Sequence, residues 1–227
     1  PADVRLPDGY DPARTYPVIV FLPYTGGEAV EFYDRLRPAV DVDSAIVVLP
    51  KGRPHSGDYL PDFTSFVEWY EDRLLADLER VSRLYSVDPR NIVLAGFSLG
   101  GDLGWALSVR NPDLFAGAVM AGTRASHPVP PGHLETLAAA GYRGAFVIGE
   151  NELVARATGI ARAEALMRST GVATRYRTVP RAGHGYGHPR DFADDLQWVL
   201  SGRAPEPGPP TVEFPSSEFP VVLKLTG

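Results

Sequence analysis

The chain has 227 residues, of which 44% are hydrophobic and 22% charged, the balance of a packed globular protein and not of a disordered or fibrous one. A formal net charge of −6, with acidic and basic residues interspersed, argues against a nucleic-acid partner, which requires clustered Lys and Arg. The absence of cysteine excludes disulfides, thiolate metal sites and a cysteine nucleophile, and no apolar stretch reaches the roughly 18 residues of a membrane span.

The N-terminus begins at Pro1 without a Met and leads directly into a strand-like segment. Its first residues lack the basic and then apolar pattern of a signal peptide. We therefore expect a soluble chain, secreted or periplasmic if a leader peptide has been removed.

Short apolar runs alternate with longer helical segments along most of the chain. The runs predict strands over 16–22, 44–49, 91–95, 116–120, 145–148 and 174–179. Several are apolar at successive positions, as expected when both faces of a parallel sheet are covered. The segments between them predict helices over 62–84, 98–109, 158–170 and 191–200. This alternation predicts an α/β fold, with a mostly parallel sheet and helices on both faces, as one domain over residues 1–202.

The C-terminal segment is rich in proline, with six between positions 205 and 220, which excludes helix and central strand there. We predict an extension over residues 203–227. Its last apolar stretch, 221–225, is expected to add an edge strand or to pack on a neighbouring molecule.

Gly96-Phe97-Ser98-Leu99-Gly100 fits the GxSxG pattern and lies between a predicted strand and a predicted helix. A serine at such a sharp turn presents its hydroxyl outward, and the glycines let strand and helix close around it. The helix N-terminus adds positive potential and a backbone N–H at Leu99 that suits a developing oxyanion. The pattern therefore predicts Ser98 as a nucleophile, with an ordinary glycine-rich turn as the alternative.

A serine hydroxyl reacts only when a neighbouring base takes its proton. His184 lies in a glycine-flanked loop after strand 174–179 and before the last helix, which is the expected place for that base. His188, four residues on, is the main rival. Of the remaining histidines, His55 lies before the strand and helix that flank Ser98, and His127 and His133 lie shortly after them.

The base in turn needs a carboxylate that fixes its tautomer and stabilises its charged form. The loop after strand 145–148 offers Glu150 and Glu152, and we prefer Glu152. The chain order of serine, acid and histidine agrees with this fold. Glu150, Asp194 and Asp195 are the alternatives, and either glutamate could instead be a solvated loop charge or a helix cap.

A second oxyanion donor is expected on the loop after strand 16–22. There Pro23-Tyr24-Thr25-Gly26-Gly27 permits a tight backbone, and the N–H of either Tyr24 or Thr25 would face Ser98. The Tyr24 side chain would also contact substrate. A plain strand-to-helix turn is the alternative.

Five stretches of the chain carry a family resemblance: segments 6–12, 87–101 and 111–117, and the loops at Gly149 and His184. With them the chain resembles bacterial serine esterases of the α/β-hydrolase superfamily, including carboxylesterases and feruloyl-esterase-like and polyester-depolymerase-like members. The resemblance covers nearly all of residues 1–202. The segment from Tyr24 is similar to the oxyanion loop of cutinase-type polyester hydrolases, which favours Tyr24 over Thr25. Pro23-Tyr24 in place of a His-Gly pair, and Glu in place of Asp, depart from many relatives.

The short interval 122–144 leaves no room for a large lid domain, so an open site is expected. Tyr24, Trp105, His127 and Tyr186 are the candidates to bind substrate, with core packing as the main alternative for Trp105.

These residues together predict hydrolysis of a small-molecule or polymeric ester through an acyl-enzyme on Ser98, with no metal or organic cofactor. A peptidase, thioesterase or acyltransferase that uses the same three side chains is the alternative function. A non-catalytic binding domain is a remote one.

Overall fold

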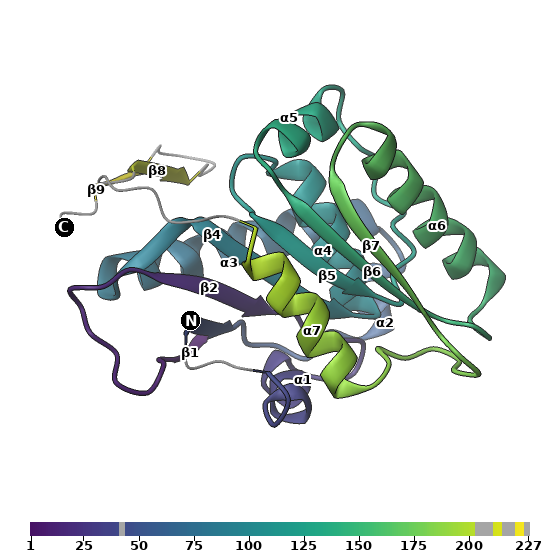
Figure 1. The fold of residues 1–227 in the computed structure, drawn as a ribbon, viewed down its shortest axis with the longest axis horizontal. Helices are drawn as coiled ribbons and strands as arrows, with labels where there is room; N and C mark the ends of the chain where they lie inside the picture. Colours follow the sequence, from purple (N-terminus) through teal and green to yellow (C-terminus); the bar gives the residue numbers. More distant parts are fainter. Residues whose placement is uncertain (41–43, 203–210, 215–220, 225–227) are drawn as a thin grey trace.

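The computed structural model describes residues 1–40, 44–202, 211–214 and 221–224, and its body is built on a seven-stranded sheet (Figure 1). The strand order is β1-β3-β2-β4-β5-β6-β7, in which β1 runs antiparallel to β3 and the other neighbours are parallel. The strands are β1 (Asp3–Arg5), β2 (Tyr16–Phe21), β3 (Ile46–Leu49), β4 (Val87–Phe97), β5 (Gly117–Ala121), β6 (Arg143–Gly149) and β7 (Ala173–Val179). The predicted α/β class and mostly parallel sheet are confirmed.

Helices occupy the connections between the strands. They are α1 (Ala29–Leu36), α2 (Ser56–Tyr59), α3 (Phe63–Leu84), α4 (Leu99–Arg110), α5 (His133–Ala139), α6 (Val154–Ser169) and α7 (Pro189–Leu200). The four predicted helices correspond to α3, α4, α6 and α7. Helices α1, α2 and α5 were not predicted, because eight residues or fewer are too short for a helical period to stand out. Among the described residues, no helix is both long and apolar enough to cross a lipid bilayer.

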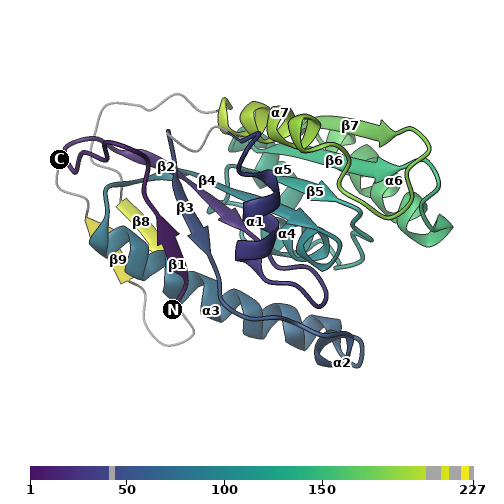
Figure 2. The ribbon, with the colours of Figure 1, turned by 90° about the horizontal axis from the view of Figure 1, so that it is seen from below.

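The sheet separates two hydrophobic clusters, and alternate residues of a strand enter each of them. In β2, Val18 and Val20 belong to the cluster that holds α3 and α4, whereas Ile19 and Phe21 belong to the cluster that holds α1 and α7. Figure 1 and Figure 2 show these two helix layers on opposite sides of the sheet. Burial on both faces explains why the strands are apolar at successive positions.

Only α5 and its flanking loops lie between β5 and β6, so the chain carries no large lid domain there, as predicted. In the C-terminal segment, β8 (Thr211–Phe214) pairs antiparallel with β9 (Val221–Lys224). The predicted edge strand at 221–225 therefore pairs with β8 and not with the seven-stranded sheet. The rest of the predicted extension, residues 203–210, 215–220 and 225–227, lies outside the described residues.

Candidate active site

Parallel strands end at the same edge of a sheet, so the loops after β2, β4, β5, β6 and β7 meet at one edge. Ser98 lies there, between the end of β4 and the start of α4, with φ 58° and ψ −116°. A positive φ strains a residue that has a side chain, and such strain is concentrated at functional sites. The turn is also tight, because a Cβ on Gly96 would lie 2.1 Å from the carbonyl oxygen of Gly100. Ser98 therefore occupies the sharp turn that the GxSxG pattern predicts.

Three side chains from separate loops form a hydrogen-bonded chain at this edge. Nε2 of His184 lies 2.9 Å from Oγ of Ser98, and Nδ1 of His184 lies 2.5 Å from Oε2 of Glu152. The other carboxylate oxygen accepts the N–H of Leu153 at 2.9 Å. The Glu152 side chain is 1% exposed and that of His184 is 37% exposed. A buried carboxylate beside Nδ1 holds the proton on that nitrogen, so Nε2 can accept the proton of the serine hydroxyl.

The alternative acids have other partners. Glu150 accepts the backbone N–H of Arg181 at 2.6 Å. Asp195 and Asp194 form ion pairs with Arg177 on β7, at 2.8 and 3.4 Å. Of the predicted carboxylates, it is therefore Glu152 that the structure places against the imidazole.

The alternative histidines are also engaged elsewhere. His188 is the N-cap of α7 and accepts the N–H of Arg190 at 3.2 Å. His55 is the N-cap residue of α2, and Nδ1 of His133 lies 2.6 Å from the carbonyl oxygen of Val109. Within the described ranges, no group of three or more His, Cys, Asp or Glu side chains is placed to hold a metal ion.

The imidazole of His184 rests against a glycine and an aromatic ring that the sequence analysis did not single out. Its ring centroid is 4.9 Å from that of Phe97. Gly122 directly follows β5 with φ +57°, and a Cβ on it would lie 3.0 Å from Cε1 of His184. The loops of the acid and the base are equally close, since a Cβ on Gly149 would lie 2.0 Å from the carbonyl oxygen of Gly183. Close approach of the backbone therefore fixes the position of the imidazole. The one sequence signal for Gly122 was its place near the end of a predicted strand.

A buried ionic network lies beside the site. Asp102, in the first turn of α4, is 2% exposed and accepts hydrogen bonds from Thr123 Oγ1 at 3.0 Å and from the N–H of Arg124 at 2.6 Å. Arg156 on α6 donates to the carbonyl oxygen of Gly122 at 2.5 Å and lies 3.9 Å from Asp102. Burial lowers the pKa of Arg156, and the negative charge of Asp102 opposes this effect. The network ties α4, α6 and the loop under the imidazole together.

The predicted oxyanion loop lies against the N-terminus of α4. A Cβ on Gly100 would lie 2.9 Å from the carbonyl oxygen of Pro23, so the two backbones almost touch. The first N–H groups of a helix have no partner within the helix, which suits Leu99 as one donor. Tyr24 and Thr25 follow Pro23 directly. An N–H from either residue as the second donor stays a prediction.

The side chains of this loop have distinct surroundings. The Tyr24 ring lies across Gly27, where an added Cβ would be 2.1 Å from Cζ, and its centroid is 6.2 Å from that of Phe97. Thr25 is exposed, and its Oγ1 lies 2.8 Å from Oη of Tyr59. Tyr24 is therefore next to the ring that supports His184, and its contact with substrate stays a prediction.

Two of the residues predicted to bind substrate, Trp105 and His127, are buried. Trp105 is 2% exposed and donates its indole N–H to the carbonyl oxygen of His127 at 2.9 Å. His127 is 6% exposed, and burial, together with the positive charge of Arg110, lowers its pKa. Arg110 ends α4, at the opposite end from Ser98. Both side chains pack into the interior, which favours the core-packing alternative for Trp105, and a contact of Trp105 or His127 with substrate has no support in these positions.

Tyr186 belongs to an aromatic cluster below the His184 loop. Its ring centroid lies 5.4 Å from Phe32, 5.5 Å from Phe97 and 6.3 Å from Phe192, and the residue is half-buried. These contacts anchor the loop. A further contact with substrate stays a prediction.

Comparisons with known proteins bear on the fold. No family model matches the sequence, and no curated protein matches it significantly. A carboxylesterase from Bacillus cereus is 18% identical with a TM-score of 0.67, over 87% of this chain and 92% of that one. A ferulic acid esterase from Anaeromyces mucronatus is 19% identical with a TM-score of 0.60, over 88% and 84%. A thermostable esterase is 18% identical with a TM-score of 0.59, and 86% of this chain matches 57% of that longer one. This chain therefore has the α/β-hydrolase fold.

Proposed function

We propose that the chain is a serine esterase that hydrolyses carboxylic esters through an acyl-enzyme on Ser98. The observation that carries the proposal is the pair of hydrogen bonds at His184, 2.9 Å to Ser98 and 2.5 Å to Glu152. The strained backbone of Ser98 supports it, because a nucleophile elbow requires that conformation. The esterases among the similar structures favour an ester as the substrate.

The reaction proceeds in two half-reactions. Oγ of Ser98 attacks the ester carbonyl carbon while Nε2 of His184 takes the hydroxyl proton, and Glu152 stabilises the imidazolium. When the tetrahedral intermediate collapses, the carbon–oxygen bond breaks and the alcohol leaves with that proton. Water then attacks the acyl-enzyme and passes a proton to Nε2. The second collapse releases the acid and returns the proton to Ser98.

The negative oxygen of each tetrahedral intermediate needs fixed donors. The N–H of Leu99 at the start of α4 is one, supported by the positive end of the helix dipole. An N–H of Tyr24 or Thr25 is the other, since their loop lies against Gly100. Removal of one such donor typically slows catalysis about 100-fold to 1,000-fold.

The absence of a lid between β5 and β6 favours an open site for small-molecule or polymeric esters. Tyr24, beside the triad, is the side chain best placed to contact the acyl or alcohol group. Residues 1–202 form the catalytic domain in this proposal.

The test is turnover of p-nitrophenyl butyrate by the wild-type chain and by Ser98→Ala. The variant should fold normally and lose at least about 1,000-fold in kcat/KM, because it lacks the oxygen that forms the acyl-enzyme. Ser201→Ala, at an exposed serine after α7, is the matched control and should keep full activity. Wild-type turnover retained in Ser98→Ala would refute the assignment. A panel of an aryl ester, a thioester and a peptide then separates esterase from the alternatives.

A further inference from the structure

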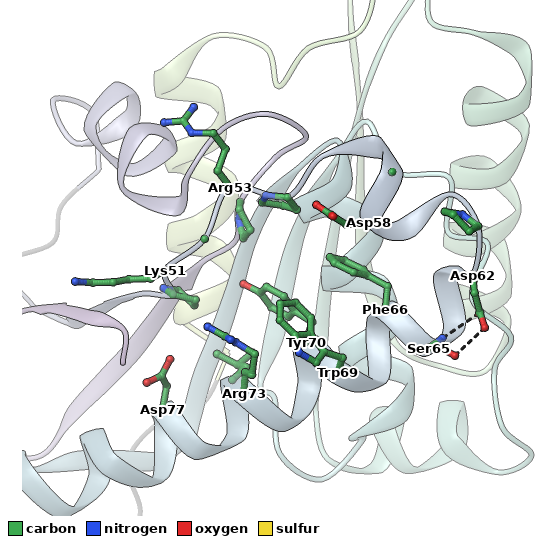
Figure 3. A pocket seen from close by; sticks show the side chains of 17 residues that line it. Lys51, Arg53, Asp58, Asp62, Ser65, Phe66, Trp69, Tyr70, Arg73 and Asp77 are labelled. Atoms are coloured by element: carbon green, nitrogen blue, oxygen red, sulfur yellow. Dashed lines mark hydrogen bonds between the residues drawn. The ribbon is translucent and has the colours of Figure 1, made fainter.

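A cavity on the side of α3 is lined by none of the residues Ser98, His184 and Glu152. Its volume is about 630 Å³, and α3 and the segment after β3 form its walls (Figure 3). This size falls in the range of pockets that bind small molecules, about 300 to 1,000 Å³. Pro23, the residue before the predicted oxyanion donors, also lines it.

The two walls of this cavity suit a flat apolar group. On α3, Phe66, Trp69 and Tyr70 form an aromatic wall, and Trp69 is 52% exposed although it is large and apolar. The facing segment contributes Pro50, Pro54 and Pro61. A ring placed between these walls would remove apolar surface on both sides from water.

The carboxylates around the cavity are already engaged in the fold. Each one accepts a backbone N–H: Asp58 that of His55 at 2.7 Å, Asp62 that of Ser65 at 3.1 Å, and Asp77 that of Ala2 at 2.8 Å. Two of the cations are engaged as well, Lys51 with Asp3 at 3.0 Å and Arg53 with Glu31 at 2.5 Å. The fold therefore holds these side chains in place without a ligand.

Two hydrogen-bond donors on α3 are available to a ligand in the cavity. Tyr70 is 7% exposed, and within the described part of the chain its hydroxyl has no hydrogen-bond partner. Burial raises the pKa of Tyr70, so the hydroxyl stays protonated and can donate. Arg73, one turn further along α3, lies over the Trp69 ring at 4.8 Å, and its guanidinium donates to no acceptor among the described residues. Figure 3 shows the Tyr70 hydroxyl turned into the cavity, beside the Arg73 guanidinium.

We propose that this cavity binds an aromatic carboxylate. The carboxylate accepts hydrogen bonds from the Tyr70 hydroxyl and the Arg73 guanidinium, and the ring lies between the aromatic wall of α3 and the prolines opposite. A charge-assisted pair of donors at one end and apolar walls at the other matches both parts of such a ligand. This inference does not rest on the proposed esterase function, because no residue of the triad takes part.

The test is isothermal titration calorimetry of the whole chain with trans-cinnamate, and with cinnamyl alcohol as the neutral probe of the same shape. Wild-type chain should bind cinnamate and bind the alcohol at least about tenfold more weakly. Tyr70→Phe and Arg73→Gln should each raise the Kd for cinnamate about tenfold or more. Arg162→Gln, at an exposed arginine on α6, is the matched control and should bind like wild type.

Cinnamate could instead enter the Ser98 site, and His184→Ala distinguishes the two locations. The proposal expects His184→Ala to bind cinnamate normally even though it loses ester turnover. No binding by the wild type, equal binding of the alcohol, unchanged binding by both α3 variants, or loss of binding in His184→Ala would each overturn it. Because an unpartnered buried hydroxyl stabilises nothing, Tyr70→Phe should not lower the melting temperature, so misfolding cannot explain its weaker binding.

Discussion

The contact between the His184 imidazole and Gly122 can be tested by adding a single methyl group at Gly122. In Gly122→Ala the new Cβ would lie 3.0 Å from Cε1 and 3.2 Å from Nδ1 of His184. Carbon atoms pack at roughly 3.5 to 4.0 Å, so the ring must move by about half an ångström. The 2.9 Å hydrogen bond to Ser98 would then lengthen or bend. Since a 1 Å misplacement costs about 100-fold, kcat should fall roughly 10-fold to 100-fold.

The matched control is Gly132→Ala. Gly132 also has a positive φ, +80°, but an added Cβ there has no neighbour within 4 Å. Both variants should lose about 1 to 2 kcal/mol of stability, because alanine is strained in the left-handed region. Thermal melts measure this loss, and p-nitrophenyl butyrate turnover measures kcat. Full activity in a folded Gly122→Ala chain, or the same loss of activity in both variants, would refute the reasoning.

Three further predictions follow from the site and its surroundings. Glu152→Gln, which keeps the shape but removes the charge 2.5 Å from Nδ1, should lower kcat by about 100-fold to 10,000-fold with little change in KM; unchanged turnover would exclude Glu152 as the acid. Trp105→Phe loses the 2.9 Å bond to His127 and should cost about 1 to 3 kcal/mol in denaturant melts while kcat stays within about twofold; a selective loss of activity would return Trp105 to the site. Burial lowers the pKa of His127 in the folded chain, so below about pH 6.5 the unfolded chain binds a proton that the folded chain does not, and stability should fall as the pH drops. Between about pH 7.5 and about pH 5.5, the melting temperature of His127→Leu should decline less than that of the wild type. Equal declines would contradict this prediction.

Local pattern was sufficient to predict the six parallel strands, the long helices and the sharp turn at Ser98, but not the short antiparallel strand β1. Ser98 follows a buried apolar strand, and Gly96 and Gly100 on either side of it allow the tight turn. The loop positions of His184 and Glu152 followed from the order of strands in the fold. The distances between the side chains of Ser98, His184 and Glu152 could not be predicted, because they depend on how three loops far apart in the chain pack against one another.

The sequence did not predict where a side chain lies when its position depends on tertiary packing. Helix α4 is buried at nearly every position from Leu99 on, so its sequence carries no apolar stripe that tells which side Trp105 faces. Arg156 lies just before the helix predicted over 158–170, and nothing in the sequence indicates that its side chain reaches Asp102 and Gly122. Neither contact has a signature in local spacing.

The most direct test of the account is covalent labelling by a fluorophosphonate probe, followed by mass mapping of the modified peptide. An activated serine reacts with such a probe, whereas an ordinary surface serine does not. We expect one probe per chain, attached to Ser98, with no labelling of Ser98→Ala and slower labelling of Glu152→Gln. An unlabelled wild-type chain, or a probe attached to another residue, would contradict the claim that Ser98, His184 and Glu152 act together.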